Sequence, residues 1–453
     1  MNFALRTALP HDARDVFAWH ERPGAFERLA PPWENVRVVE QAKTLRDGER
    51  VVLEVATGPI KQRWVAEIRD VRPGEQFVDV QVSGPFAAWR HTHAFEAAGE
   101  GRCTMHDQVT LRLPMQAVSG LVASGFVKSK LARMFRYRHE TLKADLAAHQ
   151  RLELSPMKIA ISGATGLVGS SLSAFLSTGG HDIVPISRRA LPRGVVWDPA
   201  KGFTKGTGAL EGVAAVVHLA GENIAGGRWT DARKRAIRES RLQGTRSLCE
   251  GLAKLPTKPS VLVSASAVGI YGDLGDKWAD ESTPAGKGFL EDLAVAWEKA
   301  TKPARDAGIR VVHARVGIVL SPAGGALKKM LTPFQVGVGG RLGSGEQYMS
   351  WVSIDDAIGG LAHAIATPSI DGPMNLVAPN PVTNAEFTKV LARVLRRPVG
   401  PPVPAFALRL LYGELADAAL LSGVRVRPGV LLSSAYQFRH PDLEGALRHV
   451  LGK

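Results

Sequence analysis

Residues 157–169, with the sequence MKIAISGATGLVG, decide the fold of this chain. The apolar run predicts a short buried strand, and Gly163, Gly166 and Gly169 follow it at G-x-x-G-x-x-G spacing. The apolar residues beyond them have the spacing of an amphipathic helix. Glycines at such a turn permit a tight bend, a close approach of the backbone to a pyrophosphate, and close helix–strand packing. The phosphates then lie on the N–H groups of the helix N-terminus, so this stretch predicts a dinucleotide-binding site.

Strands and helices alternate after this motif. The expected strands are residues 158–162, 181–187, 214–220, 260–265 and 310–320. This order predicts an α/β doubly wound Rossmann domain with a parallel sheet, over residues 157–380. A later strand is expected at 372–378. The Thr383-x-x-Glu386 box then predicts a capped helix in a C-terminal substrate-side lobe, residues 381–453.

The end of the second expected strand indicates which cofactor is bound. This strand runs into Ser187-Arg188-Arg189. An NAD-preferring site has an acidic residue here, which binds the ribose 2′-hydroxyl. A hydroxyl and two guanidinium groups instead fit a 2′-phosphate and predict NADP. The alternative is that the two arginines belong to a solvated surface.

Residues 1–149 are predicted to form a unit of their own, joined to the rest by a polar linker at 150–156. A first strand and two short helices precede several strands with period-2 alternation. A long amphipathic helix, roughly residues 115–149, ends the segment. This order predicts an α+β helix-grip fold. Because Met157 directly follows the linker, the chain looks like a fusion of two modules.

The N-terminal segment resembles the START-like, polyketide-cyclase-type superfamily. The stretches that carry the resemblance are residues 17–20 (FAWH) and 23–33 (PGAFERLAPPW). The resemblance implies a cavity between the sheet and the long helix that takes an apolar ligand.

Four polar residues of this segment have open roles. Asp107 stands among apolar neighbours and is either a polar anchor in the cavity or, the interpretation we favour, a residue at a bulge or strand edge. His91, His93 and His106 invite a metal interpretation. His91 and His93 share a face with Trp89 and Phe95, and no carboxylate or cysteine completes the ligand set, so no metal site is predicted.

The C-terminal part resembles the atypical, epimerase-like branch of the extended short-chain dehydrogenases/reductases. Matching stretches include residues 216–224 (VVHLAGENI), 266–272 (SAVGIYG), 315–320 (RVGIVL) and 350–356 (SWVSIDD). The resemblance implies an NADP-binding oxidoreductase of unknown substrate. The cofactor contacts that it implies are Gly163, Thr165, Gly166, Leu167, Val168, Gly169, Ser187, Arg188, Leu219, Ala220 and Arg241.

The catalytic residues depart from the pattern of that family. Active members carry Tyr-x-x-x-Lys on the helix after the fifth strand, where the lysine lowers the tyrosine pKa for proton transfer. The expected helix at 289–298 contains neither residue. Ser266 fills the position of the family's serine and Tyr271 is a substitute proton donor, as Glu222 or Asp273 could be. Without the pair, a non-catalytic NADPH-binding redox sensor or ligand carrier is the alternative function.

Composition sets outer limits on these interpretations. The chain has 453 residues, 45% of them hydrophobic and 22% charged, which is typical of a globular protein with two or three domains. Its two cysteines, Cys103 and Cys249, allow no disulfide framework, so a cytoplasmic location is expected. The net charge of +14 suits an anionic cofactor. No basic stretch is interleaved with stacking aromatics, and no segment has membrane-spanning character, so neither nucleic acid nor a membrane span is expected. A homodimer is left open.

Overall fold

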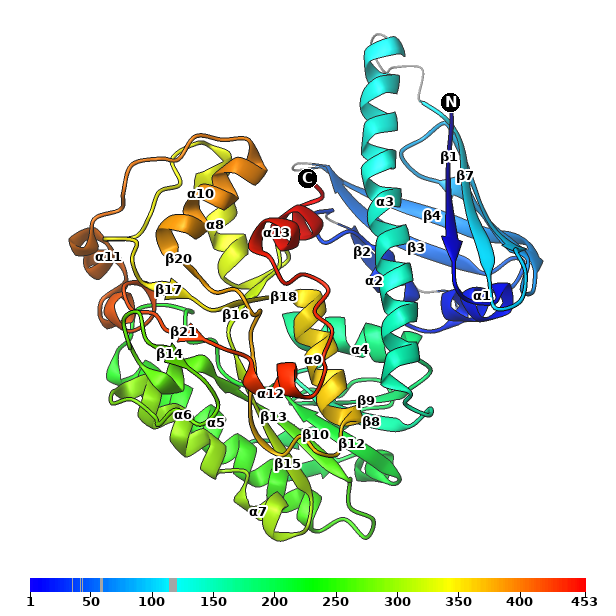
Figure 1. The fold of residues 1–453 in the computed structure, drawn as a ribbon. Helices are drawn as coiled ribbons and strands as arrows, with labels where there is room; N and C mark the ends of the chain where they lie inside the picture. The colour runs from blue at the N-terminus through cyan, green and yellow to red at the C-terminus, as the bar shows by residue number, and fades with distance from the viewer. Residues whose placement is uncertain (35, 41, 43, 58–59, 114–119) are drawn as a thin grey trace. The chain divides into compact units, whose positions relative to one another are not determined.

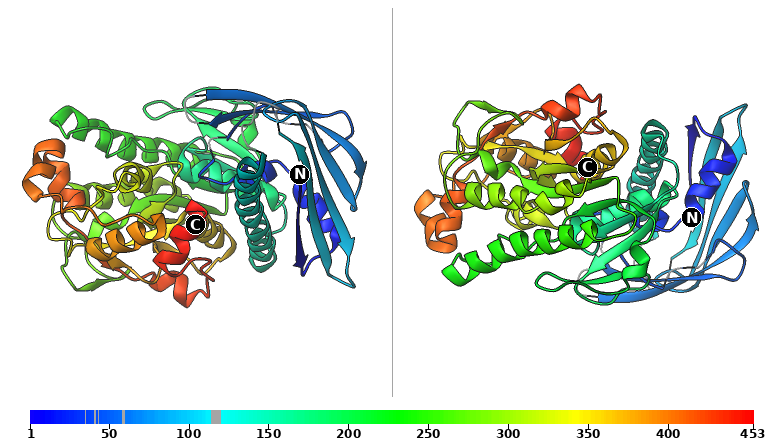
Figure 2. Two further views of the ribbon diagram at one scale, coloured as in Figure 1. Left: turned by 90° about the horizontal axis from the view of Figure 1, so that it is seen from above. Right: turned by 90° about the horizontal axis from the view of Figure 1, so that it is seen from below.

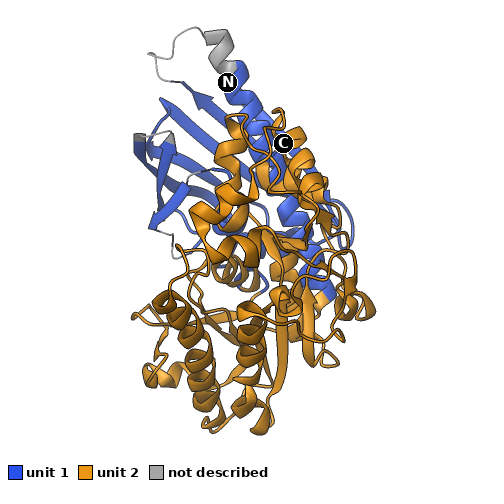
Figure 3. Cartoon of the chain, turned by 90° about the vertical axis from the view of Figure 1, so that its left-hand side faces the viewer, with its two compact units in different colours: residues 1–151, 177–179, 452 blue, residues 152–176, 180–451, 453 orange. Residues whose placement is uncertain are grey.

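A computed structural model describes residues 1–453 except 35, 41, 43, 58–59 and 114–119. The chain divides into two compact units (Figure 3). Unit 1 comprises residues 1–151, 177–179 and 452, and unit 2 comprises residues 152–176, 180–451 and 453. Within the described residues, no helix combines the length and the apolarity that crossing a bilayer requires.

Unit 1 is a curved antiparallel sheet packed against one long helix (Figures 1 and 2). The sheet has seven strands in the order β1-β7-β6-β5-β4-β3-β2. The strands are β1 (Asn2–Leu9), β2 (Val36–Glu40), β3 (Arg50–Thr57), β4 (Ile60–Arg72), β5 (Gln76–Ser83), β6 (Ala88–Ala97) and β7 (Cys103–Arg112). The helices are α1 (Ala13–Glu21), α2 (Ala25–Leu29) and α3 (Gly120–Leu152). The predicted helix-grip fold is confirmed, although the first residues expected in the long helix, 115–119, lie outside the described residues.

The alternation of strands β6 and β7 builds the core of unit 1. Trp89, Val109 and Leu111 point to one face of the sheet, where they pack with Leu131 and Phe135 of α3. A second cluster lies around helix α1 and includes Val16, Phe17, Trp19, Phe77 and Phe95. Helix α3 therefore covers the same sheet face that carries the inward histidines of β6.

Unit 2 is built on an eight-stranded sheet in the order β11-β10-β9-β8-β12-β13-β15-β19. Its strands are β8 (Lys158–Ser162), β9 (Asp182–Ser187), β10 (Val195–Asp198), β11 (Gly202–Lys205), β12 (Val213–His218), β13 (Val261–Ala267), β15 (Arg310–Val316) and β19 (Gly372–Leu376). All neighbours pair in parallel except β10 and β11. The order reverses between β8 and β12, and ligands of open α/β sheets bind at such a switch point, beyond the carboxyl ends of the strands.

Helices cover both faces of this sheet (Figure 1). They are α4 (Leu167–Thr178), α5 (Asp231–Ala253), α6 (Phe289–Lys299), α7 (Lys302–Asp306) and α9 (Ile354–Ala366). Leu248, Cys249 and Leu252 of α5 pack with Ala304 of α7 on strand residues such as Val216. The predicted Rossmann fold is confirmed.

The remaining elements of unit 2 are short helices and two-stranded pairings. The helices are η1 (Thr207–Leu210), η2 (Val268–Tyr271), α8 (Gly325–Gln335), α10 (Asn384–Leu395), α11 (Ala405–Tyr412), η3 (Ala416–Leu420), α12 (Gly429–Ser433) and α13 (Leu443–Leu451). The short strands are β14 (Trp278–Ala279), β16 (Ile318–Leu320), β17 (Tyr348–Met349), β18 (Trp351–Ser353), β20 (Val382–Thr383) and β21 (Arg425–Val426). The predicted cap of α10 is confirmed, because the Thr383 hydroxyl accepts a hydrogen bond from the Glu386 N–H.

Candidate functional site

The glycine loop connects β8 to α4 at the switch point of the sheet. Gly163 has φ +73°, and a Cβ there would lie 3.0 Å from the backbone of Leu219. A Cβ on Gly169 would collide with the carbonyl oxygen of Gly163. Thr165 and Gly166 are exposed at the turn. The loop thus has the close backbone packing that the sequence predicts.

Leu167 and Val168 are the first residues of α4. Their N–H groups belong to the helix turn that has no carbonyl partner within the helix, which makes this end a favourable place for a phosphate. Leu167 also lies against Gly324, where a Cβ would be 3.4 Å from its side chain. These two residues therefore belong to the same edge of the sheet as the glycine loop.

The loop after β12 is held against the glycine loop by one buried hydroxyl. Ser162 Oγ accepts hydrogen bonds from the N–H groups of Leu219 and Ala220, at 3.2 and 3.3 Å. The same oxygen lies 2.6 Å from Nδ1 of His218, whose Nε2 lies 3.0 Å from Oγ1 of Thr245. Burial lowers the pKa of His218 to about 4, so this imidazole is neutral. Leu219 and Ala220 are thus fixed beside Gly163.

The end of β9 carries the predicted determinant of the cofactor. Ser187 closes the strand, and its hydroxyl accepts a hydrogen bond from the Arg189 N–H at 3.2 Å. The Arg188 and Arg189 side chains are exposed, and no ion pair with either is found among the described residues. These guanidinium groups are therefore available to a ligand.

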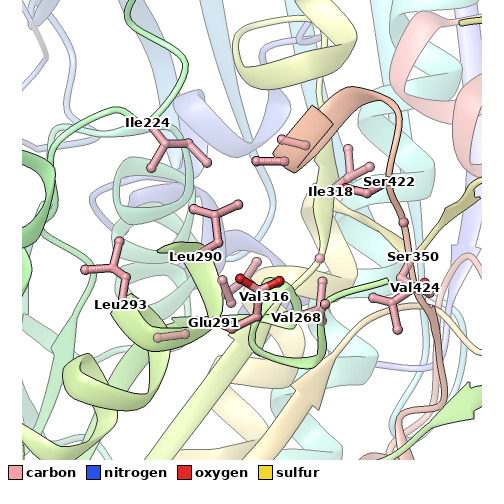
Figure 4. Close-up of a pocket in the computed structure, with 18 of the residues that line it drawn as sticks. Ile224, Val268, Leu290, Glu291, Leu293, Val316, Ile318, Ser350, Ser422 and Val424 are labelled. Atoms are coloured by element: carbon pink, nitrogen blue, oxygen red, sulfur yellow. The ribbon is translucent and has the colours of Figure 1, made fainter. Parts of the chain in front are cut away.

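A cavity of about 260 Å³ lies beyond the ends of β13 and β15 (Figure 4). Its walls come from α6, the segment after β13, the β15–β16 junction and the tail lobe. Most of the lining is apolar, as at Val268, Leu290 and Val316, whereas Ser350 and Ser422 add hydroxyl groups. Such a cavity suits a small molecule that is largely apolar.

Helix α6 presents an apolar stripe to this cavity. Leu290, Leu293, Ala294 and Trp297 follow helical spacing and line it. The helix extends one residue beyond the expected end and includes Lys299, which does not line the cavity and has Val295, not a tyrosine, four residues before it. Glu291 is the exception. Its carboxylate points into the cavity in Figure 4, and no hydrogen bond to it is found among the described residues.

Two glycines make room for the Glu291 carboxylate. Gly272 and Gly288 have φ +69° and +142°, and a Cβ on them would lie 2.9 and 2.6 Å from its oxygens. The sequence analysis missed Glu291. The sequence carried no distinct signal for it, because acidic residues are common in the first turn of a helix, where Asp292 also lies.

Arg241 lies at the border between the cavity and the loop after β12. Its guanidinium donates to the carbonyl oxygens of Glu222, at 2.9 Å, and Ile237, at 3.3 Å, and lies 4.8 Å from the Trp297 ring centroid. Burial lowers the pKa of Arg241 to about 10. Arg241 therefore shapes both sites; whether it contacts the cofactor, as the family resemblance implies, stays a prediction.

The two residues predicted to be catalytic lie in a buried network behind the cavity. Ser266 donates to Oε1 of Glu298 at 2.8 Å, and Arg315 holds both oxygens of Glu298 at 2.8 and 2.9 Å. Tyr271 is 1% exposed, donates to Asn375 Oδ1 at 2.7 Å and accepts from Arg315 at 2.9 Å. Neither Ser266 nor Tyr271 lines the cavity.

The electrostatics of this network are those of a closed set of partners. Burial alone would raise the pKa of Glu298, but the hydrogen bonds and charge of Arg315 lower it. Burial raises the pKa of Tyr271 above its ordinary value. A tyrosine in this setting holds strands together, and the geometry gives it no path to a substrate in the cavity.

Unit 1 contains a second cavity, of about 240 Å³. Apolar residues such as Phe26, Leu29 and Ile68 form much of its wall. At one end the wall is polar, with His20, Asp79, His93 and Arg138. The family resemblance implied such a cavity, and the polar end was not foreseen.

Two expectations about this region are wrong. Asp107 is 1% exposed in the middle of β7, and its pairing with β1 and β6 shows no register shift, so it lies neither at a bulge nor at an edge. It hydrogen-bonds to His91 Nε2 at 3.0 Å and to His139 Nε2 at 2.7 Å. The second wrong expectation is that no carboxylate lies near the histidines. Asp79 lies 3.6 Å from His91 and 3.3 Å from His93.

Three family models match the chain in succession. One described as polyketide cyclase / dehydrase and lipid transport matches residues 9–140. One described as the NAD dependent epimerase/dehydratase family matches residues 159–377, and a domain of unknown function matches residues 403–450.

Individual proteins are similar over large parts of their length. Epimerase family protein Mb2239 of Mycobacterium bovis is 46% identical over 291 residues, which are 64% of this chain and 96% of that protein. The structure of human epimerase family protein SDR39U1 with NADPH is 34% identical, with a TM-score of 0.61 over 65% of this chain and 99% of that one. A crystal structure from Corynebacterium glutamicum, described as a nucleoside-diphosphate sugar epimerase, is 34% identical, with a TM-score of 0.83 over 99% of this chain and 90% of that one.

Proposed function

Because the chain belongs to the NAD dependent epimerase/dehydratase family, we propose that unit 2 is an NADP(H)-dependent oxidoreductase for a small, largely apolar molecule. The observation that carries the proposal is the Glu291 carboxylate, which faces an apolar cavity close to the predicted cofactor edge. The substrate would occupy that cavity, with the Ser422 hydroxyl as a polar contact, because the Ser350 hydroxyl is already bonded to the backbone of Val424 and Val426.

The residues at the switch point fit NADP(H). Gly163 and Gly169 are packed so closely that a Cβ on either would press on backbone atoms, which is the cradle that a pyrophosphate requires. Arg188 and Arg189 at the end of β9 would hold the 2′-phosphate. The human relative with NADPH supports the same choice. When bound, the nicotinamide supplies or accepts a hydride.

Glu291 would hold the proton that the reaction requires. A carboxyl group at an apolar wall can give a proton to a carbonyl oxygen or take one from a hydroxyl group. Its carboxylate is held between Gly272 and Gly288 by shape alone, so it is free to bond to a substrate. The predicted assignment of catalysis to Ser266 and Tyr271 is replaced in this proposal by Glu291.

The cofactor part of the proposal is tested by titrating the full chain with NADPH and NADH, followed by nicotinamide fluorescence. We expect tighter binding of NADPH. In Arg188→Asp the ratio of the two affinities should fall at least about tenfold, the value of one charge-assisted contact. Lys205→Asp, on the neighbouring strand β11, controls for net charge. An unchanged ratio in Arg188→Asp contradicts the NADP assignment.

The catalytic part is tested by NADPH oxidation across a panel of aldehydes and ketones. Glu291→Gln should lower kcat about 100-fold while NADPH affinity stays within twofold, because the amide keeps the shape and loses the proton. Asp292→Asn, the next residue on the exposed side of α6, is the matched control.

A redox sensor without turnover is the second candidate. The apolar stripe of α6 favours it, since no tyrosine or lysine of this helix lines the cavity. Tight NADPH binding with no oxidation by any compound of the panel would support the sensor and contradict the oxidoreductase.

A further inference from the structure

Two neighbouring strands of unit 1 bring a carboxylate and two imidazoles together at one place. Asp79 lies on β5, and both His91 and His93 lie on β6. The inter-strand register pairs Asp79 with His91, and pairs His93 with Asp107 on β7. Because side chains two residues apart on a strand share a face, both imidazoles point the same way as the two carboxylates. His91 and His93 are 2% and 5% exposed.

The distances from Asp79 to the two imidazole nitrogens match a metal polyhedron. Asp79 Oδ2 lies 3.6 Å from His91 Nδ1 and 3.3 Å from His93 Nε2, and all three atoms lie within 4.8 Å of one another. Zinc binds nitrogen and oxygen at about 2.0–2.2 Å in a tetrahedron, which puts neighbouring ligands about 3.3–3.6 Å apart. The two distances from Asp79 to the imidazole nitrogens therefore already have the value that a shared ion would impose.

Asp107 sets the orientation of the imidazole rings from behind. Its Oδ1 lies 3.0 Å from His91 Nε2 and 2.8 Å from His93 Nδ1, and its Oδ2 hydrogen-bonds to His139. A carboxylate only accepts, so a neutral His91 that donates its N–H to Asp107 at 3.0 Å directs its lone pair at Asp79. Metal-binding histidines characteristically make this carboxylate–histidine contact on the far side of the ring.

Two electron-rich groups facing each other require a positive charge between them. A neutral His91 would present a lone pair to the Asp79 carboxylate, which is unfavourable in a buried place. Either additional protons or a metal ion resolve this. The cavity of unit 1 reaches Asp79 and His93, so an ion has a way in and keeps a coordination position that faces the cavity.

We propose that Asp79, His91 and His93 bind one divalent transition metal ion, with Asp107 as the positioning carboxylate and an open coordination position toward the cavity of unit 1. Two histidines and one carboxylate with open positions are typical of zinc and of ferrous iron. At the same end of the cavity, the Nε–H of Arg138 is buried and has no hydrogen-bond partner among the described residues. The cavity therefore suits a molecule with an anionic group that binds the metal while its apolar part lies along Phe26 and Leu29.

The experiment uses the full chain, stripped with a chelator and titrated with Co²⁺, a spectroscopic probe for such sites. We expect one equivalent to bind, with visible absorption bands of four- or five-coordinate cobalt, and one equivalent of Zn²⁺ to displace it. His91→Gln with His93→Gln should lower the affinity at least 100-fold. His106→Gln, an equally buried histidine that faces Glu96 on the same sheet, should leave it within threefold.

A further variant distinguishes loss of metal binding from unfolding of unit 1. Asp79→Asn keeps the shape of a half-exposed side chain, so its far-ultraviolet circular dichroism and its NADPH binding should match the parent while cobalt affinity falls at least tenfold. No stoichiometric binding by the parent overturns the proposal and identifies protons as the charge between Asp79 and the imidazoles. Binding that survives in the double histidine variant overturns it as well.

The open position is tested by adding azide or formate to the cobalt-loaded protein. A shift of the visible bands is expected, because a small anion reaches the metal from the cavity. Unchanged bands would overturn the open position and describe a closed, structural site.

Discussion

Two buried charged clusters of this chain use similar residues in opposite ways. In unit 2, Glu298 and Arg315 bind each other through two hydrogen bonds. Ser266 makes a further hydrogen bond to Glu298, and Tyr271 accepts one from Arg315. In unit 1, the imidazoles lie between two carboxylates, and one edge of the cluster opens on a cavity. Burial of charge is common to both. A cluster whose bonds close among its own members stabilises a fold, whereas ligand atoms that converge beside a cavity can accept a further partner.

The largest effect should come from breaking the closed cluster. Arg315→Met leaves the Glu298 carboxylate buried and uncompensated, so the free energy of unfolding of unit 2 should fall by about 3–5 kcal/mol. Native-state hydrogen exchange at β13 and β15 measures this. Arg305→Ala breaks an exposed pair with Asp371 and should cost less than about 1 kcal/mol. Equal effects of the two variants would contradict the view that the Glu298–Arg315 cluster stabilises the fold more than an exposed ion pair does.

An intermediate effect is expected at His218, a buried imidazole with hydroxyl partners instead of carboxylates. Its pKa is about 4 in the folded chain against an ordinary 6.5, so the unfolded state takes up the proton first as the pH falls. Stability is fully present above pH 6.5 and declines toward pH 4, by up to about 3 kcal/mol. Urea unfolding at successive pH values measures this slope. In the His218→Gln variant, the free energy of unfolding should depend less on pH over this range. An unchanged pH dependence would mean that other groups cause it.

The smallest effect sharpens the interpretation of Tyr271. Tyr271→Phe removes the hydroxyl that bridges Arg315 and Asn375, at a cost of about 1–2 kcal/mol of stability. Because Tyr271 does not line the cavity, NADPH affinity and any turnover should remain within twofold. A large loss of turnover with unchanged stability would return Tyr271 to the catalytic machinery.

Features that depend only on residues close together in the sequence were predicted correctly. The glycine turn, the strand that precedes it and the cap at Thr383 are local features, and all three are present as predicted. The end of β9 was placed correctly for the same reason. Parallel strands that end at one edge bring such local signals together without any knowledge of side-chain packing.

The missed residues depend on register and packing between segments. Asp79 meets His91 only because a hairpin pairs β5 with β6 in one register, and a shift by one residue would turn Asp79 to the other face. Glu298 of α6 contacts Arg315 of β15 only because this helix packs on the sheet. Asp107 was misjudged because a lone charged residue among apolar neighbours is an edge signal unless its partners on other strands are known.

The hydroxyl of Ser162 has a spectroscopic consequence. Its oxygen accepts from the Leu219 and Ala220 N–H groups, so its own hydrogen can only be donated, and His218 Nδ1 is the acceptor beside it. The imidazole is thereby fixed as the tautomer with hydrogen on Nε2, directed at Thr245. Its ¹⁵N resonances should therefore stay those of one tautomer from neutral pH down to about pH 4. They provide a built-in reporter of whether the glycine loop is intact, readable with no ligand added.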